Sequence, residues 1–270
     1  MGSLRVRRRV PVALSIAGSD SGGGAGVQAD LNTFGAHGVF GTTAITAVTV
    51  QNTMGVSDYE ALSPQLVAAQ VRAIADDLGV DAAKTGMLAS SAIVEAVADA
   101  IAQGGIPALV VDPVSVSKHG HALLAPDAVA ALRARILPLA TLVTPNLPEA
   151  ATLTGVAVAS REDMAAAAEA ILALGARAVL VKGGHLEDGT ADDLFVDATR
   201  REWLPGRRID SVHTHGTGCV LSAAITARLA LGSELLDAVR AGKAFVTEAI
   251  EHGLVVGHGI GPVDPLWERR

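Results

Sequence analysis

The feature that most constrains the fold of this chain is a repeated alternation of short apolar runs with longer segments of helical periodicity. Each short run is typical of a buried strand, and each longer segment is typical of a helix that packs on a sheet. The predicted strands span residues 12–17, 41–50, 108–111, 142–144 and 178–181, and residues 194–196 and 202–204 form a predicted hairpin. This order predicts an α/β fold with a mostly parallel central sheet flanked by helices.

Local signals mark where the helices begin and end. Ser63 stands before Pro64, which suits an N-cap followed by proline in the first turn. Ser90 or Ser91 begins a second helix, and Ser160 begins a third that has acidic residues in its first turn. Further helices are predicted over residues 27–34, 217–231 and 233–252. No linker or internal repeat interrupts this pattern, so residues 11–270 are predicted to form one domain.

Composition and charge restrict the classes of function. The 270 residues carry a formal net charge of -7 and show no basic face, which argues against a nucleic-acid partner. Residues 1–10 are rich in arginine, and we expect a disordered basic leader because the apolar run that follows is short for a secretion signal. No apolar run approaches the roughly 20 residues that cross a bilayer. A single cysteine excludes a disulfide framework and suits a reducing cytoplasm.

A glycine-rich loop follows the first predicted strand. Residues 18–26 read GSDSGGGAG and precede a predicted helix. Glycines let the backbone approach a ligand closely and turn its N–H groups toward an anion. No glycine trio in this loop has the dinucleotide spacing G-x-G-x-x-G, and the chain has no Walker A pattern. The loop is therefore either a flexible turn or a ligand loop of another kind, and we favour the ligand loop.

A second loop, residues 213–219 with the sequence HTHGTGC, precedes an apolar helix. Backbone N–H groups at a helix N-terminus, together with the helix dipole, suit a phosphate group. Cys219 lies in the first turn, where we expect the dipole to lower the thiol pKa from about 8.5. The histidines at 213 and 215 do not have helical metal-binding spacing, so we interpret them as polar loop groups and not as a zinc site.

Six ordered motifs resemble a known family. They are residues 16–26 (IAGSDSGGGAG), 51–53 (QNT), 84–88 (KTGML), 144–150 (TPNLPEA), 182–185 (KGGH) and 215–219 (HGTGC). From Val12 to Pro262 the chain resembles the bacterial hydroxymethylpyrimidine and phosphomethylpyrimidine kinases of thiamin biosynthesis, in the ribokinase superfamily. The resemblance implies a ribokinase-like three-layer α/β/α fold, a homodimer, and ATP with Mg²⁺. It also implies two phosphorylations, first of the 5-hydroxymethyl group of an aminopyrimidine and then of the resulting monophosphate.

The resemblance assigns roles to individual residues. The pyrimidine is expected to lie against Gly18, Asp20, Ala25, Gln51, Met87 and Val114. Among these, the Gln51 amide offers both a donor and an acceptor to an aminopyrimidine edge, and Met87 packs on the ring. Asn146, Lys182, Gly183, Thr217 and Gly218 are expected to hold the nucleotide, and Asp112 and Glu149 the Mg²⁺. Gly216, Thr217, Gly218, Cys219 and Lys182 are the expected catalytic group.

Sugar kinases of the superfamily carry a catalytic Asp where this chain has Cys219. Our hypothesis is that Cys219 is the base for the first phosphorylation, with positioning of the substrate as its alternative role. Three other residues also have structural alternatives: Glu149 as a helix-start carboxylate, Asp112 as a turn residue and Lys182 as a surface charge.

The chain departs from the family pattern at four positions, Ser115, Ser117, His119 and Val220, which we expect to affect the substrate and phosphate neighbourhoods. Two alternative functions stay open. One is a pyridoxine or pyridoxal kinase of vitamin B6 salvage, although Gln51 favours the aminopyrimidine. The other is a non-catalytic ligand-binding module.

Overall fold

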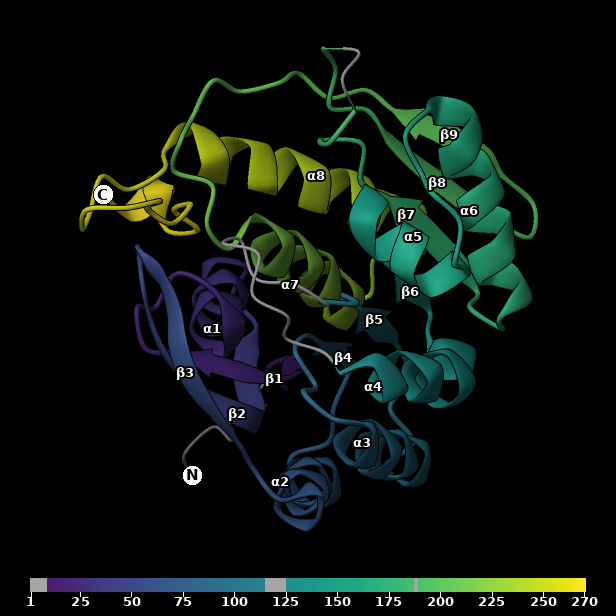
Figure 1. Ribbon diagram of the computed structural model, residues 1–270. Helices are drawn as coiled ribbons and strands as arrows, with labels where there is room; N and C mark the ends of the chain where they lie inside the picture. Colours follow the sequence, from purple (N-terminus) through teal and green to yellow (C-terminus); the bar gives the residue numbers. More distant parts are fainter. Residues whose placement is uncertain (1–8, 115–124, 187–188) are drawn as a thin grey trace, which may run out of the picture.

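The computed structural model describes residues 9–114, 125–186 and 189–270. Within these residues the strands form one nine-stranded sheet in the order β3-β2-β1-β4-β5-β6-β7-β8-β9 (Figure 1). The strands are β1 (Val12–Asp20), β2 (Phe40–Asn52), β3 (Gly55–Ala61), β4 (Ala82–Thr85), β5 (Leu109–Val111), β6 (Leu142–Val143), β7 (Ala178–Val181), β8 (Asp193–Asp197) and β9 (Arg201–Leu204). The six parallel strands are neighbours in this order, namely β2, β1, β4, β5, β6 and β7, and β3, β8 and β9 add antiparallel edges.

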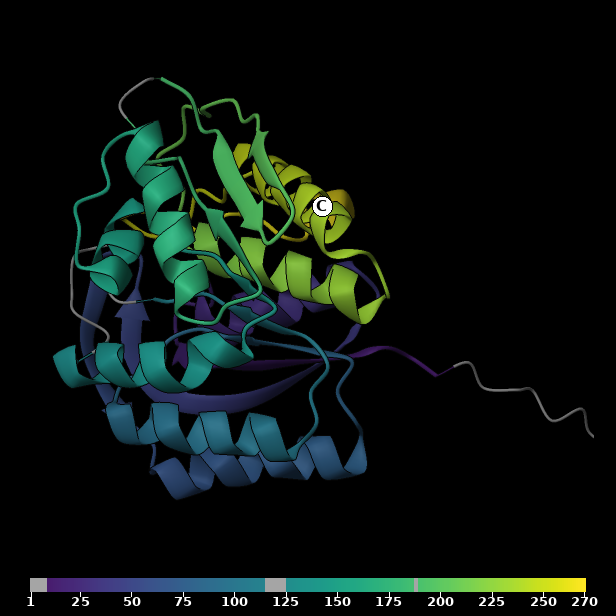
Figure 2. The ribbon, with the colours of Figure 1, turned by 90° about the vertical axis from the view of Figure 1, so that its right-hand side faces the viewer.

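Helices cover both faces of the sheet (Figures 1 and 2). They are α1 (Gly26–Ala36), α2 (Pro64–Asp77), α3 (Ser91–Gln103), α4 (Pro126–Ala131), α5 (Leu147–Thr154), α6 (Arg161–Ala173), α7 (Thr217–Ala230) and α8 (Leu235–Glu251). Helices α2 to α6 share one core with one face, and α1, α7 and α8 pack on the other. The expected three-layer α/β/α fold is confirmed. Among the described helices, none has the length and hydrophobicity needed to cross a membrane.

The helix starts follow the local signals. The Ser63 side chain accepts a hydrogen bond from Leu66 N, and Ser90, not Ser91, caps α3. Ser160 and Asp163 form a capping box at the start of α6, in which each side chain accepts from the other residue's backbone N–H. These caps satisfy N–H groups that a helix leaves unpaired, which explains why short sequence patterns locate them.

Four elements were not predicted, β3, β4, α4 and α5, and each is short or lacks a clear apolar pattern. Among the described strands, β3 pairs only with β2, and most of its residues are exposed, so it shows no buried face in the sequence. Helix α4 has only six residues, which is too short for helical periodicity to be recognised. Strands β1 and β2 also run further than predicted, to Asp20 and Asn52. The hairpin of β2 and β3 therefore extends past the last residue of β2 that pairs with β1, and it carries Gln51.

The strand order indicates where a ligand-binding crevice lies in the sheet. From β1 the chain first adds β2 on one side and later β4 on the other, so β1 and β4 lie at a topological switch point. The glycine-rich loop follows β1, and Asp112, Asn146 and Lys182 follow β5, β6 and β7. All these loops meet at the carboxyl edge of the sheet. Of the predicted leader, Arg9 and Val10 are described as exposed and without regular secondary structure, and residues 1–8 lie outside the described residues.

Candidate active site

A cavity of about 770 Å³ opens at the carboxyl edge of the sheet. Its wall includes almost all the predicted site residues: Gly18, Asp20, Ala25, Gln51, Met87, Asp112, Val114, Asn146, Glu149, Lys182, Gly216, Thr217, Gly218 and Cys219. Gly183 is the predicted residue that does not line it. The Gly183 backbone N–H donates to Asp193 Oδ1 over 2.9 Å, and a side chain at 183 would collide with the Asp192 carbonyl. Gly183 therefore shapes the loop from behind the cavity wall.

Lys182 lies between two buried carboxylates. Its Nζ atom is 3.2 Å from Asp112 Oδ1 and 3.6 Å from Glu149 Oε2. Burial alone would lower the pKa of Lys182, but the charges of Asp112 and Glu149 outweigh burial and raise that pKa. Lys182 is therefore an ammonium cation inside the cavity and not a surface charge, which removes one of the structural alternatives.

Glu149 has two functions in the same cluster. It accepts from Asn146 N over 2.8 Å, while Asn146 Oδ1 accepts from Glu149 N over 2.8 Å, so the two residues form the capping box of α5. Burial raises the pKa of Glu149, and the nearby charge of Asp112 adds to this, against the attraction of Lys182. The helix-start alternative for Glu149 is thus correct, and it places the carboxylate at the cavity wall as well.

The donor set fits Mg²⁺ in one specific way. Asp112 and Glu149 supply two hard carboxylates beside the Asn146 amide. This number matches Mg²⁺ in nucleotide sites, which takes one or two carboxylates together with phosphate oxygens and water. In the described residues, no group of three or more His, Cys, Asp and Glu side chains could hold a metal by itself. The site therefore suits a cation that arrives with phosphate.

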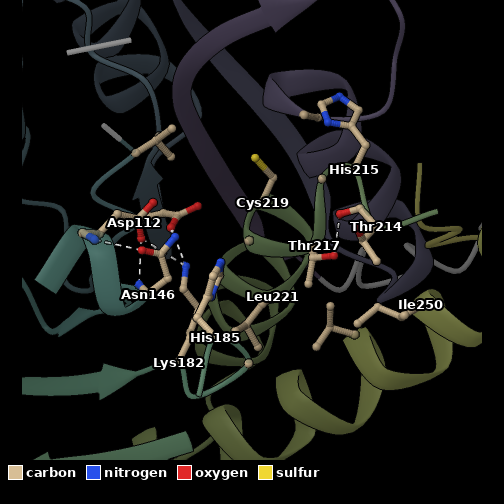
Figure 3. A pocket seen from close by; sticks show the side chains of 18 of the residues that line it. Asp112, Asn146, Lys182, His185, Thr214, His215, Thr217, Cys219, Leu221 and Ile250 are labelled. Atoms are coloured by element: carbon tan, nitrogen blue, oxygen red, sulfur yellow. Dashed lines mark hydrogen bonds and ion pairs between the residues drawn. The ribbon is translucent and has the colours of Figure 1, made fainter. Parts of the chain in front are cut away.

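The anion loop, residues 213–219, touches this charged cluster from the other side. Gly216 has φ of +82° and packs against the Gly24 carbonyl so closely that a side chain would collide with it. A Cβ at Gly218 would lie 3.4 Å from both Asp112 Oδ2 and Lys182 Nζ. The N-terminus of α7 is therefore close to Lys182, and Figure 3 shows Cys219 between the group of Asp112, Asn146 and Lys182 and the side chain of His215.

The expectation that the helix dipole lowers the pKa of Cys219 is wrong. Burial raises the pKa of the Cys219 thiol to about 12, and the charges of Asp30 and Asp112 add to the effect. The charge of Lys84 and a hydrogen bond from the Gly26 N–H act in the opposite direction but are outweighed. The side chain lies half-buried at the cavity wall as a neutral thiol.

The Asp20 carboxylate organises the glycine-rich loop. It accepts backbone hydrogen bonds from Gly22, Gly24 and Ala25, at 2.8, 3.1 and 2.8 Å. Its Oδ2 atom is also 2.9 Å from His215 Nε2. Burial would raise the pKa of Asp20, but the interaction with His215 and the backbone N–H donors lower it. Direct contact between this carboxylate and substrate stays a prediction.

Three contacts between polar side chains were missed by the sequence analysis. His215 contacts Asp20, which is 195 residues away, so no local spacing pointed to the pair. Lys84 and Asp30 form a fully buried ion pair at 2.9 Å below the cavity, and Lys243 pairs with Asp193 at 2.6 Å in its wall. The KTG motif contains Lys84 but does not reveal that this lysine is buried.

The far end of the cavity is apolar. Leu221, Val246 and Ile250 line it from α7 and α8, and Figure 3 shows Leu221 and Ile250 on the side away from Asp112. This surface suits the flat face of a base. Of the four departures from the family pattern, Val220 is fully buried in the core of α7 and does not line the cavity. Ser115, Ser117 and His119 lie outside the described residues.

Known proteins resemble this chain over most of its length. A model of the phosphomethylpyrimidine kinase family matches residues 20–264. A hydroxymethylpyrimidine/phosphomethylpyrimidine kinase of Streptomyces coelicolor is 53% identical over 257 residues, covering 95% of each chain. The solved phosphomethylpyrimidine kinase of Clostridium difficile has a TM-score of 0.79 and 43% identity, covering 88% of this chain and 99% of that one. An ADP complex of Bacillus subtilis pyridoxal kinase has a TM-score of 0.90 and 41% identity, covering 96% and 99%.

Proposed function

The chain belongs to the phosphomethylpyrimidine kinase family, and from this premise we propose that it phosphorylates 4-amino-5-hydroxymethyl-2-methylpyrimidine and then the monophosphate. ATP is the phosphoryl donor, in keeping with the ADP bound to the similar pyridoxal kinase. These two steps supply the pyrimidine diphosphate of thiamin biosynthesis. One observation carries the proposal: the N-terminus of α7 lies beside Lys182 and Asp112, in a cavity that Gln51 and Met87 also line.

Phosphoryl transfer depends mainly on positioning and on neutralising charge. Lys182 offers a fixed ammonium to the transferred group. Gly218, in the first turn of α7, lies against Lys182 and Asp112, so the N-terminus of this helix is close to the same region. Asn146 and Glu149 hold the start of α5 against Lys182. Mg²⁺, when bound with the nucleotide, would be held by Asp112 and Glu149 and would offset the charge on the phosphates.

Two roles were open for Cys219, and we assign it to positioning the substrate hydroxyl. The raised pKa of its thiol supports this choice, because a thiol with a pKa of about 12 is almost entirely protonated near neutral pH. The second acceptor is already an anionic phosphate and needs little help from a base. The same residue can therefore serve both phosphorylations.

The remaining assignments rest on the resemblance. We propose a single kinase domain over residues 11–270 that works in the cytoplasm as a homodimer. Phe40, Val48 and Val50 expose apolar side chains on β2, which is compatible with contact between two copies. Sedimentation at low concentration should give the mass of a dimer, and a monomer mass would remove that part of the proposal.

A coupled ADP-release assay tests the activity. Purified protein receives ATP and Mg²⁺ with the hydroxymethylpyrimidine, its monophosphate or pyridoxine in separate reactions. We expect turnover of both pyrimidines. Turnover of pyridoxine alone would move the function to vitamin B6 salvage, which the similarity to pyridoxal kinase makes the second candidate. No turnover in any reaction would favour a binding module.

A further inference from the structure

We propose that His215 fixes the orientation of the Gln51 amide and thereby determines which hydrogen-bonding edge of a pyrimidine the cavity accepts. This inference rests on the proposed function, because it concerns how Gln51 recognises the ring. His215 is a positioning residue in this scheme and acts through Gln51. The two side chains come from the anion loop and from the end of β2, and their contact joins the two loops that enclose this end of the cavity.

The first step is the position of the proton on the His215 ring. His215 Nε2 lies 2.9 Å from Asp20 Oδ2, and both side chains are buried. Asp20 accepts three backbone N–H groups, so its carboxylate is held in the ionised form, which has no proton to donate. Nε2 of His215 must therefore carry the proton. Protonation of the other ring nitrogen would leave this N–H unchanged.

The second step is the direction of the Gln51 amide. Gln51 Nε2 lies 3.1 Å from His215 Nε2, and Gln51 Oε1 lies 3.2 Å from Thr49 Oγ1. With Nε2 of His215 protonated, this arrangement sets two donors against each other. Thr49 has one hydroxyl proton, which the Ser19 carbonyl accepts at 2.9 Å. Exchanging the amide oxygen and nitrogen resolves both conflicts. The single Nε2–H of His215 is then shared between Asp20 Oδ2 and Gln51 Oε1 in a three-centre hydrogen bond, and the amide N–H₂ donates to Thr49 Oγ1.

The third step is the consequence for the ligand. An amide held at both ends presents its remaining lone pair and N–H in one fixed order. A 4-aminopyrimidine edge places a donor beside a ring-nitrogen acceptor, whereas the 4-oxo analogue places an acceptor beside a ring N–H donor. A free amide can turn over to pair with either edge, but a fixed amide pairs with only one. His215 therefore excludes the 4-oxo ring through Gln51.

Two substitutions of His215 separate this role from simple packing. His215→Gln keeps an N–H donor near the position of Nε2, and His215→Met keeps the volume without a donor. Each enzyme is assayed with 4-amino-5-hydroxymethyl-2-methylpyrimidine and with its 4-oxo analogue. We expect wild type and His215→Gln to favour the amino compound in kcat/KM by roughly 10- to 100-fold, as for one mispaired buried group. In His215→Met the two compounds should become nearly equivalent.

Thr49→Val is a second variant in case His215→Met does not fold. It removes the hydroxyl that accepts the Gln51 N–H₂, so discrimination between the two pyrimidines should weaken although His215 is intact.

Nitrogen-15 NMR of the imidazole ring supplies a readout that needs no turnover, and it should show a proton on Nε2 of His215. A bare Nε2, or equal discrimination by wild type and His215→Met, overturns the inference. Failure of wild type to phosphorylate the aminopyrimidine would instead overturn the proposed function.

Discussion

At the scale of single residues, the chemistry of the site depends on the protonation of Cys219. Alkylation requires the thiolate, whose fraction rises about tenfold per pH unit below the pKa. With the pKa raised to about 12, the alkylation rate of the folded protein should keep rising through pH 10. The chain has one cysteine, so mass spectrometry with iodoacetamide reports on this thiol alone. The unfolded chain is the control and should level off above about pH 8.5. A plateau near pH 8 in the folded protein would contradict the buried neutral thiol.

The role of that thiol can be tested by removing it. If Cys219 positions the hydroxyl, Cys219→Ala should lose less than about tenfold in kcat on the alcohol substrate, because a general base usually contributes about 10²- to 10⁴-fold. Phosphorylation of the monophosphate should change by a similar small factor. The comparison requires both substrates and a circular dichroism check of the fold. A loss of that larger size confined to the alcohol would restore Cys219 as the base.

At the scale of elements, the two capping boxes offer a matched pair. Asn146 caps α5 at the cavity, and Ser160 caps α6 away from it. Replacing either residue by Ala should lower the free energy of unfolding by about 0.5–2 kcal/mol, as for other lost caps. Only Asn146→Ala should also reduce turnover strongly, because the Asn146 amide lines the cavity and its Oδ1 anchors the backbone N–H of Glu149, whose carboxylate lies beside Lys182. Urea unfolding and the kinase assay measure the two effects, and equal loss of turnover in both variants would argue against this coupling.

The same comparison shows what local sequence can predict. Caps, glycine stops and buried strands are encoded within a few residues. Ser63 and Ser160 were identified correctly as caps, and Ser90 was one of two candidates for the cap of α3. Edge strand β3 was not, because its stability comes from pairing with β2 and not from its own pattern. In the site, the residues at strand ends could be placed together from topology alone. The contacts of His215 with Asp20 and Gln51 could not, since they depend on how two distant loops pack.

At the scale of the whole molecule, the site joins elements from both halves of the chain, so its ligands should stabilise the entire fold. Lys182 already pairs with both Asp112 and Glu149 in the free protein, and we therefore expect Mg²⁺ alone to leave the melting temperature unchanged. ADP with Mg²⁺ should raise it by several degrees, since ligand at 100 times Kd contributes about 2.7 kcal/mol and each kcal/mol shifts a domain of this size by roughly 2–4 °C.

Removing the metal with EDTA should abolish most of that shift, because the phosphates would then meet two carboxylates whose charge Lys182 offsets only in part. Asp112→Asn should reduce the difference between ADP with Mg²⁺ and ADP with EDTA. The matched control is Glu169→Gln, which changes an exposed carboxylate on α6 that pairs with Arg201 of β9. It should leave the difference intact. Differential scanning fluorimetry measures all of these melting temperatures. A shift with Mg²⁺ alone as large as with the nucleotide would mean that the carboxylates form a metal site without phosphate, contrary to the arrangement around Lys182.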